Sequence, residues 1–442
     1  MTSDGGSPTD VLVEVTNTLS VPYTTGMQRV TREVLRGLAG PAGHDLTVTP
    51  VVRPILLGDY RRLTAEEAER LRRHPPGGHG RRRADRFGPL APLVRTTLDL
   101  GPTRQVRAAL GRARGRRALT PEVRALTEPL PPIGSIWLDL EATWHNPEPR
   151  TELLPRMRAA GIHTAVMVAD VMPELHPEWF DPNQRTMFGE WLRAHLRDTE
   201  LFLCISRRTA EDLRAVAARV DAPEPETVVV PLGADFPVVD PRPVDLPVDL
   251  GRFLLVVGTV EPRKNQELVI DMFDVLSRRH PDLGVVLVGK EGWLVDDLVD
   301  RIRSHPHFGS RLLWLEGIDD AQLAWLYRQA FLAVAPSRYE GLGMPVMEAL
   351  HHGCATVASN GGALPEAGGD AATYVDPDDV DGLCVVVERH LLDPDFHAGA
   401  VARATAWAAP TWDGAAAAVG DALRDLAGRT PPLVPGGSGG HR

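Results

Sequence analysis

The sequence predicts an α/β protein with two doubly wound, Rossmann-like domains that face a cleft. Its 442 residues exceed the roughly 150 of one typical domain. Short apolar runs alternate with helical segments through both halves, which indicates parallel sheets covered by helices. A proline-rich stretch, 237–247, separates the halves. Proline cannot join the interior of a sheet, so this stretch indicates a linker.

These observations place an N-terminal domain in residues 1–240 and a C-terminal domain in residues 241–428. We allow for a last helix that packs back on the N-terminal domain. Residues 429–442 are rich in Pro and Gly, a composition that predicts a disordered tail.

The N-terminal half contains several strand-like runs and one clear helix. Residues 27–38 predict an amphipathic helix with Met27, Val30, Val34 and Leu38 on one side. The apolar runs that predict strands are 11–15, 46–52, 136–140, 164–168, 201–205 and 227–230.

The C-terminal half has a more regular rhythm. The run 253–258 is apolar and ends in Gly, so it predicts a buried strand. A helix with one apolar face is predicted at 266–280. Further strands are predicted at 284–288, 311–315, 331–335 and 355–358, with helices at 320–330 and 345–352.

The composition excludes several classes of protein. Lys and Arg number 48 and Asp and Glu number 59, a net charge of −11, so a protein that coats nucleic acid is not expected. Cys204, Cys354 and Cys384 are too scattered for a disulfide framework or a Cys-rich zinc site, which predicts buried thiols. No secretory signal opens the chain, and no run reaches the roughly 20 apolar residues of a membrane span. We expect a cytoplasmic protein that at most touches a membrane from one side.

An Arg-rich segment, about 53–124, interrupts the first domain and is predicted to be partly loop. Its basic helical stretches, such as 103–117, suit an anionic membrane surface and a lipid-linked acceptor. A solvated, partly disordered insertion is the alternative. Contact between its arginines and an acidic acceptor is a third interpretation.

Two glutamates separated by seven residues form the sharpest pattern. Glu340 follows a predicted strand, so it lies at the sheet edge where open α/β sheets bind ligands. Gly341 and Gly343 allow close approach of the backbone to a ligand, and Pro345 fits the first turn of a helix. A helix start behind such a loop favours an anion such as diphosphate. Glu348 can then accept hydrogen bonds from a ribose diol, and Glu340 from a second sugar; the alternative is a capping loop with a solvated glutamate.

A second pattern, 261–265, follows the strand that ends at Gly258. Its adjacent cations, Arg263 and Lys264, can neutralise a diphosphate leaving group at the same sheet edge. The alternative interpretation is a solvated basic loop.

These patterns resemble the retaining glycosyltransferases of family 4, which have the GT-B fold, and especially their mannosyl- and rhamnosyltransferase-like subgroup. The resemblance covers most of the chain except the Arg-rich segment and both tails. The similar blocks are 25–30, 204–206, 230–234, 257–265, 288–293, 337–343, 364–366 and 369–372.

The resemblance implies a role for each matching residue. Lys264 and Arg263 would hold the donor diphosphate, Glu348 the nucleotide ribose and Glu340 the donor sugar. The remaining residues implied in donor binding are Gly258, Thr259, Gly341, Leu342, Gly343 and Met344, and those on the acceptor side are Gly26, Gln28 and Arg29. Such enzymes generally need no metal, so we expect neither a metal nor a cofactor.

The chain departs from the family in one place. Many relatives carry a His-Asp pair at the end of an N-domain strand, where this sequence has Ala169 and Asp170. Asp170 remains to orient the acceptor hydroxyl. His145 could substitute for the missing imidazole, although a surface histidine is the simpler interpretation.

The resemblance thus implies transfer of a hexose, with retention, from a nucleotide-diphosphate sugar to a glycan, lipid-linked or natural-product acceptor. GDP-mannose is the favoured donor, and UDP- and dTDP-sugars stay open. The alternatives are another GT-B enzyme, such as a sugar-nucleotide epimerase, and a non-catalytic glycosyltransferase-like partner protein.

Overall fold

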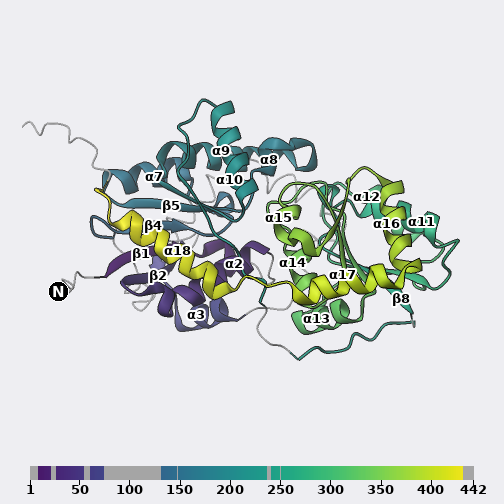
Figure 1. Ribbon diagram of the computed structural model, residues 1–442. Helices are drawn as coiled ribbons and strands as arrows, with labels where there is room; N and C mark the ends of the chain where they lie inside the picture. The colour runs from purple at the N-terminus through teal and green to yellow at the C-terminus, as the bar shows by residue number, and fades with distance from the viewer. Residues whose placement is uncertain are drawn as a thin grey trace, which may run out of the picture.

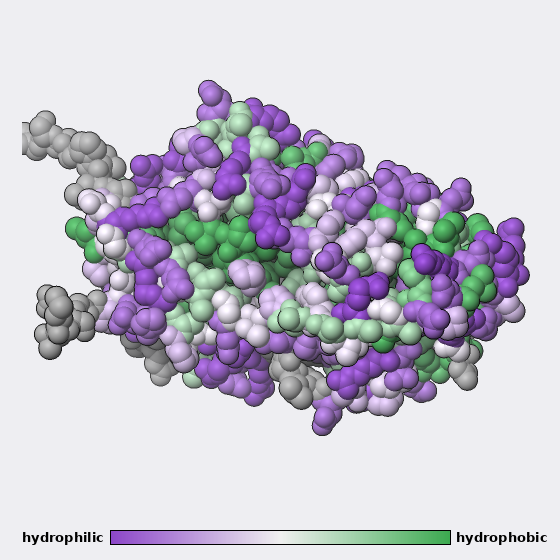
Figure 2. Space-filling model, viewed as in Figure 1, coloured by the Kyte–Doolittle hydropathy of each residue, from purple (hydrophilic) through white to green (hydrophobic). Residues whose placement is uncertain are grey.

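The computed structural model shows two α/β domains side by side (Figure 1). It describes residues 8–20, 26–53, 60–73, 131–146, 148–235, 240–248 and 250–431. Hydrophilic residues cover most of the face seen in Figure 2, while apolar residues gather beside α18 (Trp412–Ala427).

The N-terminal domain is built on one sheet with the described strand order β3-β2-β1-β4-β5-β6-β7. All neighbours are parallel except the β2–β3 pair at one edge. The inner strands β4, β5 and β6 are buried along their whole length, because helices cover both faces of a parallel sheet. The strands are β1 Thr9–Glu14, β2 Leu46–Val52, β3 Arg61–Arg62, β4 Ile136–Asp139, β5 His163–Val168, β6 Leu201–Cys204 and β7 Thr227–Val229.

Helices connect these strands and cover the sheet (Figure 1). Several begin at a side chain that caps the free backbone N–H groups of the first turn. Asp181 caps α9 in this way, and Ser206 caps α10. The helical segments are α1 Thr16–Ser20, α2 Gly26–Leu38, η1 Pro41–Gly43, α3 Ala65–Arg72, η3 Thr143–His145, α7 Arg150–Ala159, α8 Met172–Leu175, η4 Pro177–Trp179, α9 Pro182–Asp198 and α10 Arg207–Arg219.

The C-terminal domain has a fully parallel sheet with the described order β10-β9-β8-β11-β12-β13. The order reverses between β8 and β11, and open sheets bind ligands beyond the carboxyl ends of their strands at such a point. The strands are β8 Arg252–Val257, β9 Leu283–Val288, β10 Leu312–Leu315, β11 Leu332–Ala335, β12 Thr356–Ser359 and β13 Thr373–Val375.

The helices of this domain follow the strands one by one. A buried cluster in which Phe273, Val285 and Leu383 take part joins the sheet to the helices on one face. The helical segments are η5 Pro262–Lys264, α11 Gln266–Leu276, α12 Asp296–Arg303, α13 Asp320–Gln329, α14 Met344–His351, α15 Leu364–Gly368, η6 Gly369–Ala371, α16 Val380–Leu392 and α17 Pro394–Ala406.

The last helix, α18, lies on the N-terminal domain, whereas α17 lies along the C-terminal domain (Figure 1). It packs against α2 so closely that a Cβ atom on Gly37 would lie 2.2 Å from Cβ of Ala416. Its backbone N–H at Trp412 donates to Oδ1 of Asp235 at 2.6 Å. The chain therefore passes between the domains twice.

The segments that interrupt the predicted pattern are only partly described. Residues 60–73, which the sequence assigned to the Arg-rich segment, form β3 and α3 and belong to the N-terminal domain. Residues 74–130, including the stretch 103–117, lie outside the described residues, as do 236–239 of the linker and 432–442 of the tail. None of the described helices has the length and apolar character of a membrane span.

A buried ion cluster joins β1, β4 and α7 in the N-terminal domain. Nε of Arg150 lies 2.6 Å from Oδ2 of Asp139, and its Nη2 lies 2.7 Å from Oε2 of Glu14. All three side chains are at most 1 % exposed. The two buried carboxylates are tolerated because Arg150 pairs with both of them.

Replacement of Arg150 by Met should therefore leave two carboxylates buried without a cation. We expect a loss of about 3–5 kcal/mol in the free energy of unfolding of this domain, measured by urea titration. Arg72→Met is the control, because the Arg72 side chain is 69 % exposed. A loss below about 1 kcal/mol would show that the cluster contributes little.

Candidate active site

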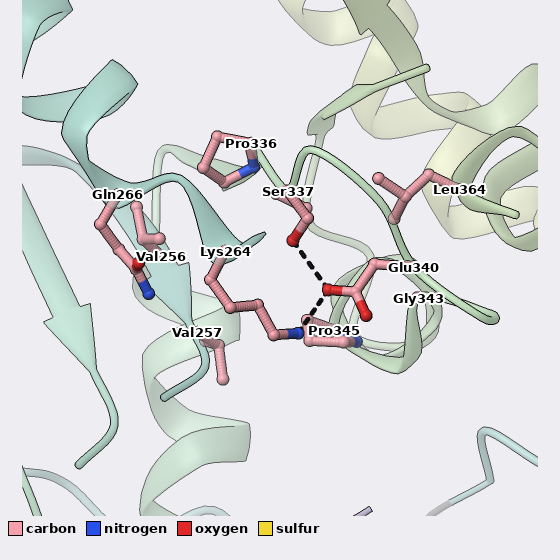
Figure 3. Close-up of a pocket in the computed structure, with 11 residues that line it drawn as sticks. Val256, Val257, Lys264, Gln266, Pro336, Ser337, Glu340, Gly343, Pro345 and Leu364 are labelled. Carbon is pink, nitrogen blue, oxygen red and sulfur yellow. Dashed lines mark hydrogen bonds and ion pairs between the residues drawn. The ribbon is translucent and has the colours of Figure 1, made fainter. Parts of the chain in front are cut away.

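The two sequence patterns meet at the carboxyl ends of neighbouring strands. β8 leads into η5, which carries Arg263 and Lys264, and β11 leads into the loop that carries Glu340. Lys264, Ser337, Glu340 and Pro345 line one small pocket (Figure 3). The free space in it is about 10 Å³, roughly one water molecule. Side chains therefore fill the place where these groups converge.

The carboxylate of Glu340 is the centre of this cluster. Lys264 Nζ lies 2.5 Å from its Oε1, and Arg263 Nη1 lies 2.7 Å from its Oε2. Ser337 Oγ donates to the same Oε1 at 2.7 Å (Figure 3). The alternatives of a solvated glutamate and a solvated basic loop are wrong, because these three charged side chains are only 10–19 % exposed.

Electrostatics keep the cluster ionised in spite of its burial. Burial alone disfavours the carboxylate, but the two cations outweigh it and lower the pKa of Glu340 to about 2. Burial would lower the pKa of Arg263, yet nearby carboxylates, Glu340 first, raise it above its usual range. The site thus presents two fixed positive charges that share the Glu340 carboxylate as a partner.

Two further carboxylates surround Arg263. Glu261 Oε1 lies 2.7 Å from Arg263 Nη2. Asp170, at the end of β5, approaches from the N-terminal domain, and its Oδ1 accepts from the backbone N–H of Met172 at 3.0 Å. Burial raises the pKa of both Glu261 and Asp170, although Arg263 opposes the rise.

The start of α14 forms one wall of the pocket. Gly343 precedes the helix at φ 104°, a conformation that favours glycine, and Pro345 follows in the first turn. Glu348 lies one turn further, where the hydroxyl of Tyr327 donates to its Oε2 at 3.0 Å. Burial raises the pKa of Glu348, and the nearby charge of Arg29 opposes the rise.

A glycine at the end of β8 lets the segments around Lys264 pack closely. Gly258 has φ 147°, and a Cβ atom there would lie 3.4 Å from Cδ and Cε of Lys264. Gly289, after β9, would place a Cβ atom 2.1 Å from the carbonyl oxygen of Gly258. Thr259 continues this turn, and its carbonyl accepts from Gln266 Nε2 at 3.0 Å.

The loop with Glu340 also contacts the N-terminal domain. A Cβ atom on Gly341 would lie 2.1 Å from the carbonyl oxygen of Ala169. The carbonyl of Gly341 accepts from Ser206 Oγ at 2.6 Å, and Thr209 Oγ1 lies 3.1 Å away. Leu342 and Met344 continue the loop and pack into a core shared by both domains.

The sequence did not indicate the polar contacts that extend this interface, which we call the latch: Arg208, Asp212, Tyr339 and Glu366. The hydroxyl of Tyr339 donates to Asp212 Oδ2 at 2.5 Å and accepts from Arg208 Nε at 2.6 Å. Glu366 accepts from the backbone N–H of Arg207 at the start of α10. The sequence signals for these residues are that Tyr339 and Glu366 lie in the similar blocks 337–343 and 364–366, and that Arg208 and Asp212 share one helix face.

The residues predicted on the acceptor side lie near the start of α2. A Cβ atom on Gly26 would lie 3.8 Å from Sδ of Met344, across the domain interface. Gln28 is buried, and its Nε2 donates to Asn17 Oδ1 at 3.3 Å. Arg29 forms an ion pair of 2.6 Å with Asp320 of α13. His145 is exposed in η3, and Thr25 lies outside the described residues.

A comparison with protein families finds a match to most of the C-terminal domain. Residues 245–407 match the model described as "Glycosyl transferases group 1". This segment is a group 1 glycosyltransferase domain. Arg263, Lys264, Glu340 and Glu348 all lie within it.

Several curated relatives of the chain are mannosyltransferases, and others are glycogen synthases. The chain is 33 % identical over 207 residues to the serotype-specific mannosyltransferase WbdA of Escherichia coli, which is 44 % of this chain and 25 % of that protein. It is 34 % identical over 160 residues to the O-antigen chain mannosyltransferase B of E. coli, which is 35 % of this chain and 41 % of that protein. The match spans less than half of either relative.

Among solved structures, sucrose-phosphate synthase from Thermosynechococcus elongatus has a similar fold, with a TM-score of 0.59 at 18 % identity. The likeness covers 95 % of this chain and 99 % of that one. It therefore extends beyond the glycosyltransferase domain to the N-terminal domain, and the two Rossmann-like domains together form a GT-B fold, as predicted.

The close approach at Gly341 gives a test of the domain interface. In Gly341→Ala the added Cβ atom meets the carbonyl of Ala169, so the domains should separate. We expect a larger radius of gyration by small-angle X-ray scattering. Gly399→Ala is the matched control, because its Cβ atom would lie 3.8 Å from one flexible arginine. Identical scattering curves for wild type and Gly341→Ala would contradict this interface.

Proposed function

We propose that the protein is a retaining mannosyltransferase, which transfers mannose from GDP-mannose to a hydroxyl group of a glycan, lipid-linked or natural-product acceptor. The group 1 domain and the mannosyltransferases among its relatives support the chemistry and the sugar. The observation that carries the proposal is the convergence of Arg263, Lys264 and Glu340 beside the start of α14.

Cleavage of the donor leaves negative charge on the diphosphate, and two fixed cations stabilise that charge as it develops. Lys264 and Arg263 are these cations, and both lie at the carboxyl ends of the strands. The backbone N–H groups that open α14 add a partial positive charge. Since side chains supply the charge, the proposal requires no metal. Glu348 would bind the ribose through its free carboxylate oxygen.

Transfer breaks the bond between the sugar C1 and the diphosphate oxygen and forms a bond from C1 to the acceptor oxygen on the same face. The acceptor proton leaves toward the departing phosphate. Asp170, whose carboxylate lies on the N-domain side of the cluster, would orient the acceptor hydroxyl. Glu340 would hold the hydroxyl groups of the donor sugar.

The direct experiment incubates purified protein with radiolabelled GDP-mannose, UDP-glucose or a dTDP-sugar, with and without EDTA. We expect release of GDP from GDP-mannose at a rate that EDTA does not change. Conversion of the donor to an isomeric nucleotide sugar would favour an epimerase. No binding of any donor would favour a non-catalytic partner protein.

Lys264→Ala should slow turnover of the donor by at least about 10²-fold, because it removes charge stabilisation of the leaving group. Steady-state release of GDP measures the effect. Lys264→Arg retains the charge and should recover part of the rate, and Arg72→Ala, on the exposed face of α3, should not change it. Wild-type turnover in Lys264→Ala would refute the assigned role.

Glu348→Ala should weaken binding of GDP by about tenfold or more, because a buried carboxylate that holds a ribose diol is lost. Isothermal titration calorimetry with GDP measures the change. Circular dichroism shows whether the variant is folded, since Glu348 also accepts from Tyr327. Equal affinity in a folded variant would exclude Glu348 from the donor site.

A further inference from the structure

A second, larger cavity lies against the same segment that carries Arg263 and Lys264. It measures about 530 Å³, within the roughly 300–1,000 Å³ typical of ligand sites. Trp179 of η4 lines it from the N-terminal domain, and Glu261, Leu294 and Asp297 line it from the C-terminal domain. Both domains therefore contribute to the cavity, and Arg263, Lys264 and Glu340 are not among the residues that line it.

The apolar part of the cavity wall is held in place. The ring of Trp179 stacks on His176, with centroids 4.1 Å apart and an interplanar angle of 14°. Its carbonyl oxygen accepts from Trp293 Nε1 at 2.8 Å, which ties the wall to the other domain. Next to Trp293, Leu294 is 62 % exposed and has φ 56°. A solvent-exposed leucine in a left-handed conformation is unfavourable by itself, and such strain gathers at ligand sites.

The polar part of the wall is mostly acidic. Its lining includes four acidic residues, Glu261, Glu267, Asp296 and Asp297. Glu261 is paired with Arg263 and Glu267 lies 3.8 Å from Arg301, while Arg338 in the same wall is paired with Asp378. Asp296 and Asp297 therefore supply most of the negative charge of this wall. Carboxylates accept hydrogen bonds from hydroxyl groups, whereas they repel phosphate and other anions. An aromatic ring beside such acceptors suits a neutral polyhydroxylated ligand, which has both C–H and O–H groups.

An aromatic run leads from the cavity to the loop that holds Glu340. Trp179 stacks on His176, and the ring of His176 lies 5.2 Å from that of Tyr339. Glu261, at the other side, lines the cavity and also holds Arg263. A chain that begins at the reacting centre would therefore enter the cavity within a short distance.

From these observations we infer that the cavity binds uncharged sugar units of the acceptor, next to the one that receives the new bond. The inference rests on the proposed function for the identity of the reaction, but it assigns the substrate class: a neutral oligosaccharide end, rather than a phosphorylated or otherwise anionic one. The Trp179 ring would contact the sugar faces, and the carboxylates would bind their hydroxyl groups.

Binding can be tested without turnover. Saturation-transfer NMR and calorimetry would follow α-mannotriose, maltotriose and mannose 6-phosphate added to the full-length protein. We expect at least one trisaccharide to bind in the millimolar range or tighter, and mannose 6-phosphate to bind at least about tenfold more weakly. If neither trisaccharide binds, or if the phosphate binds as well, the inference is overturned.

Variants then locate the site. Trp179→Ala should weaken trisaccharide binding by at least about tenfold, and Leu294→Ala should weaken it in the same direction. Leu294 is exposed, so its truncation should not destabilise the fold. The Leu294 variant therefore tests the site even if Trp179→Ala does not fold. Leu392→Ala is the matched control, because Leu392 is 68 % exposed on α16, away from this wall. Wild-type affinity in both cavity variants would overturn the assignment.

GDP binding separates this inference from the proposed function. Trp179→Ala should bind GDP as tightly as wild type, because the ring does not line the Lys264 pocket. Trisaccharide binding without any GDP binding would refute the proposed transfer reaction while the sugar site stands. GDP binding without trisaccharide binding would refute the sugar site alone.

Discussion

The ion pairs of Glu340 with Arg263 and Lys264 are the interaction on which the rest of the site depends. These residues are 76 and 77 positions apart in the chain, and they meet only because β8 and β11 are parallel neighbours. Buried charges are stable when they are paired, so under the proposed function a donor diphosphate would share or replace the Glu340 carboxylate as the partner of the two cations. The affinity for such a ligand would then depend on the difference in free energy between two states: the cations paired with Glu340, and the cations paired with the ligand.

The residue after Glu340 connects this electrostatic cluster to the domain interface. Glu340 binds the two cations, while the carbonyl of Gly341 is held by Ser206 and Thr209 of the other domain. A shift of the backbone at Glu340 would therefore also displace the Gly341 carbonyl, which the N-terminal domain binds. Tyr339, on the other side of Glu340, contacts Asp212 and strengthens the same connection. Three consecutive residues, 339–341, thus link the ion cluster to the contacts between the domains.

The sequence was sufficient for most of the strands because each is an apolar run of four to seven residues, and these runs reappear as the two sheets with shifts of about one residue at their ends. It missed β3 and β13, since Arg61–Arg62 has no apolar signal and Thr373–Val375 is only three residues long. The convergence of Lys264 and Glu340 followed from the rule that parallel strands end at one edge. The contacts of Tyr339 with Asp212 and of Trp179 with Trp293 were not predicted, because they depend on how the two domains are oriented, which no local pattern encodes. Glu261 lay in the predicted pattern 261–265, but its ion pair with Arg263 was not predicted.

The return of α18 to the N-terminal domain limits how the two halves can move. The backbone N–H of Ala234 donates to the carbonyl of Pro410 at 2.9 Å, so the outgoing and returning segments lie side by side where they cross. A pair of adjacent tethers permits rotation about an axis through both but resists sliding and twisting. We therefore expect any relative motion of the domains to be a hinge rotation. The part of the cleft near the two connecting segments would move least, and the part farthest from them would move most.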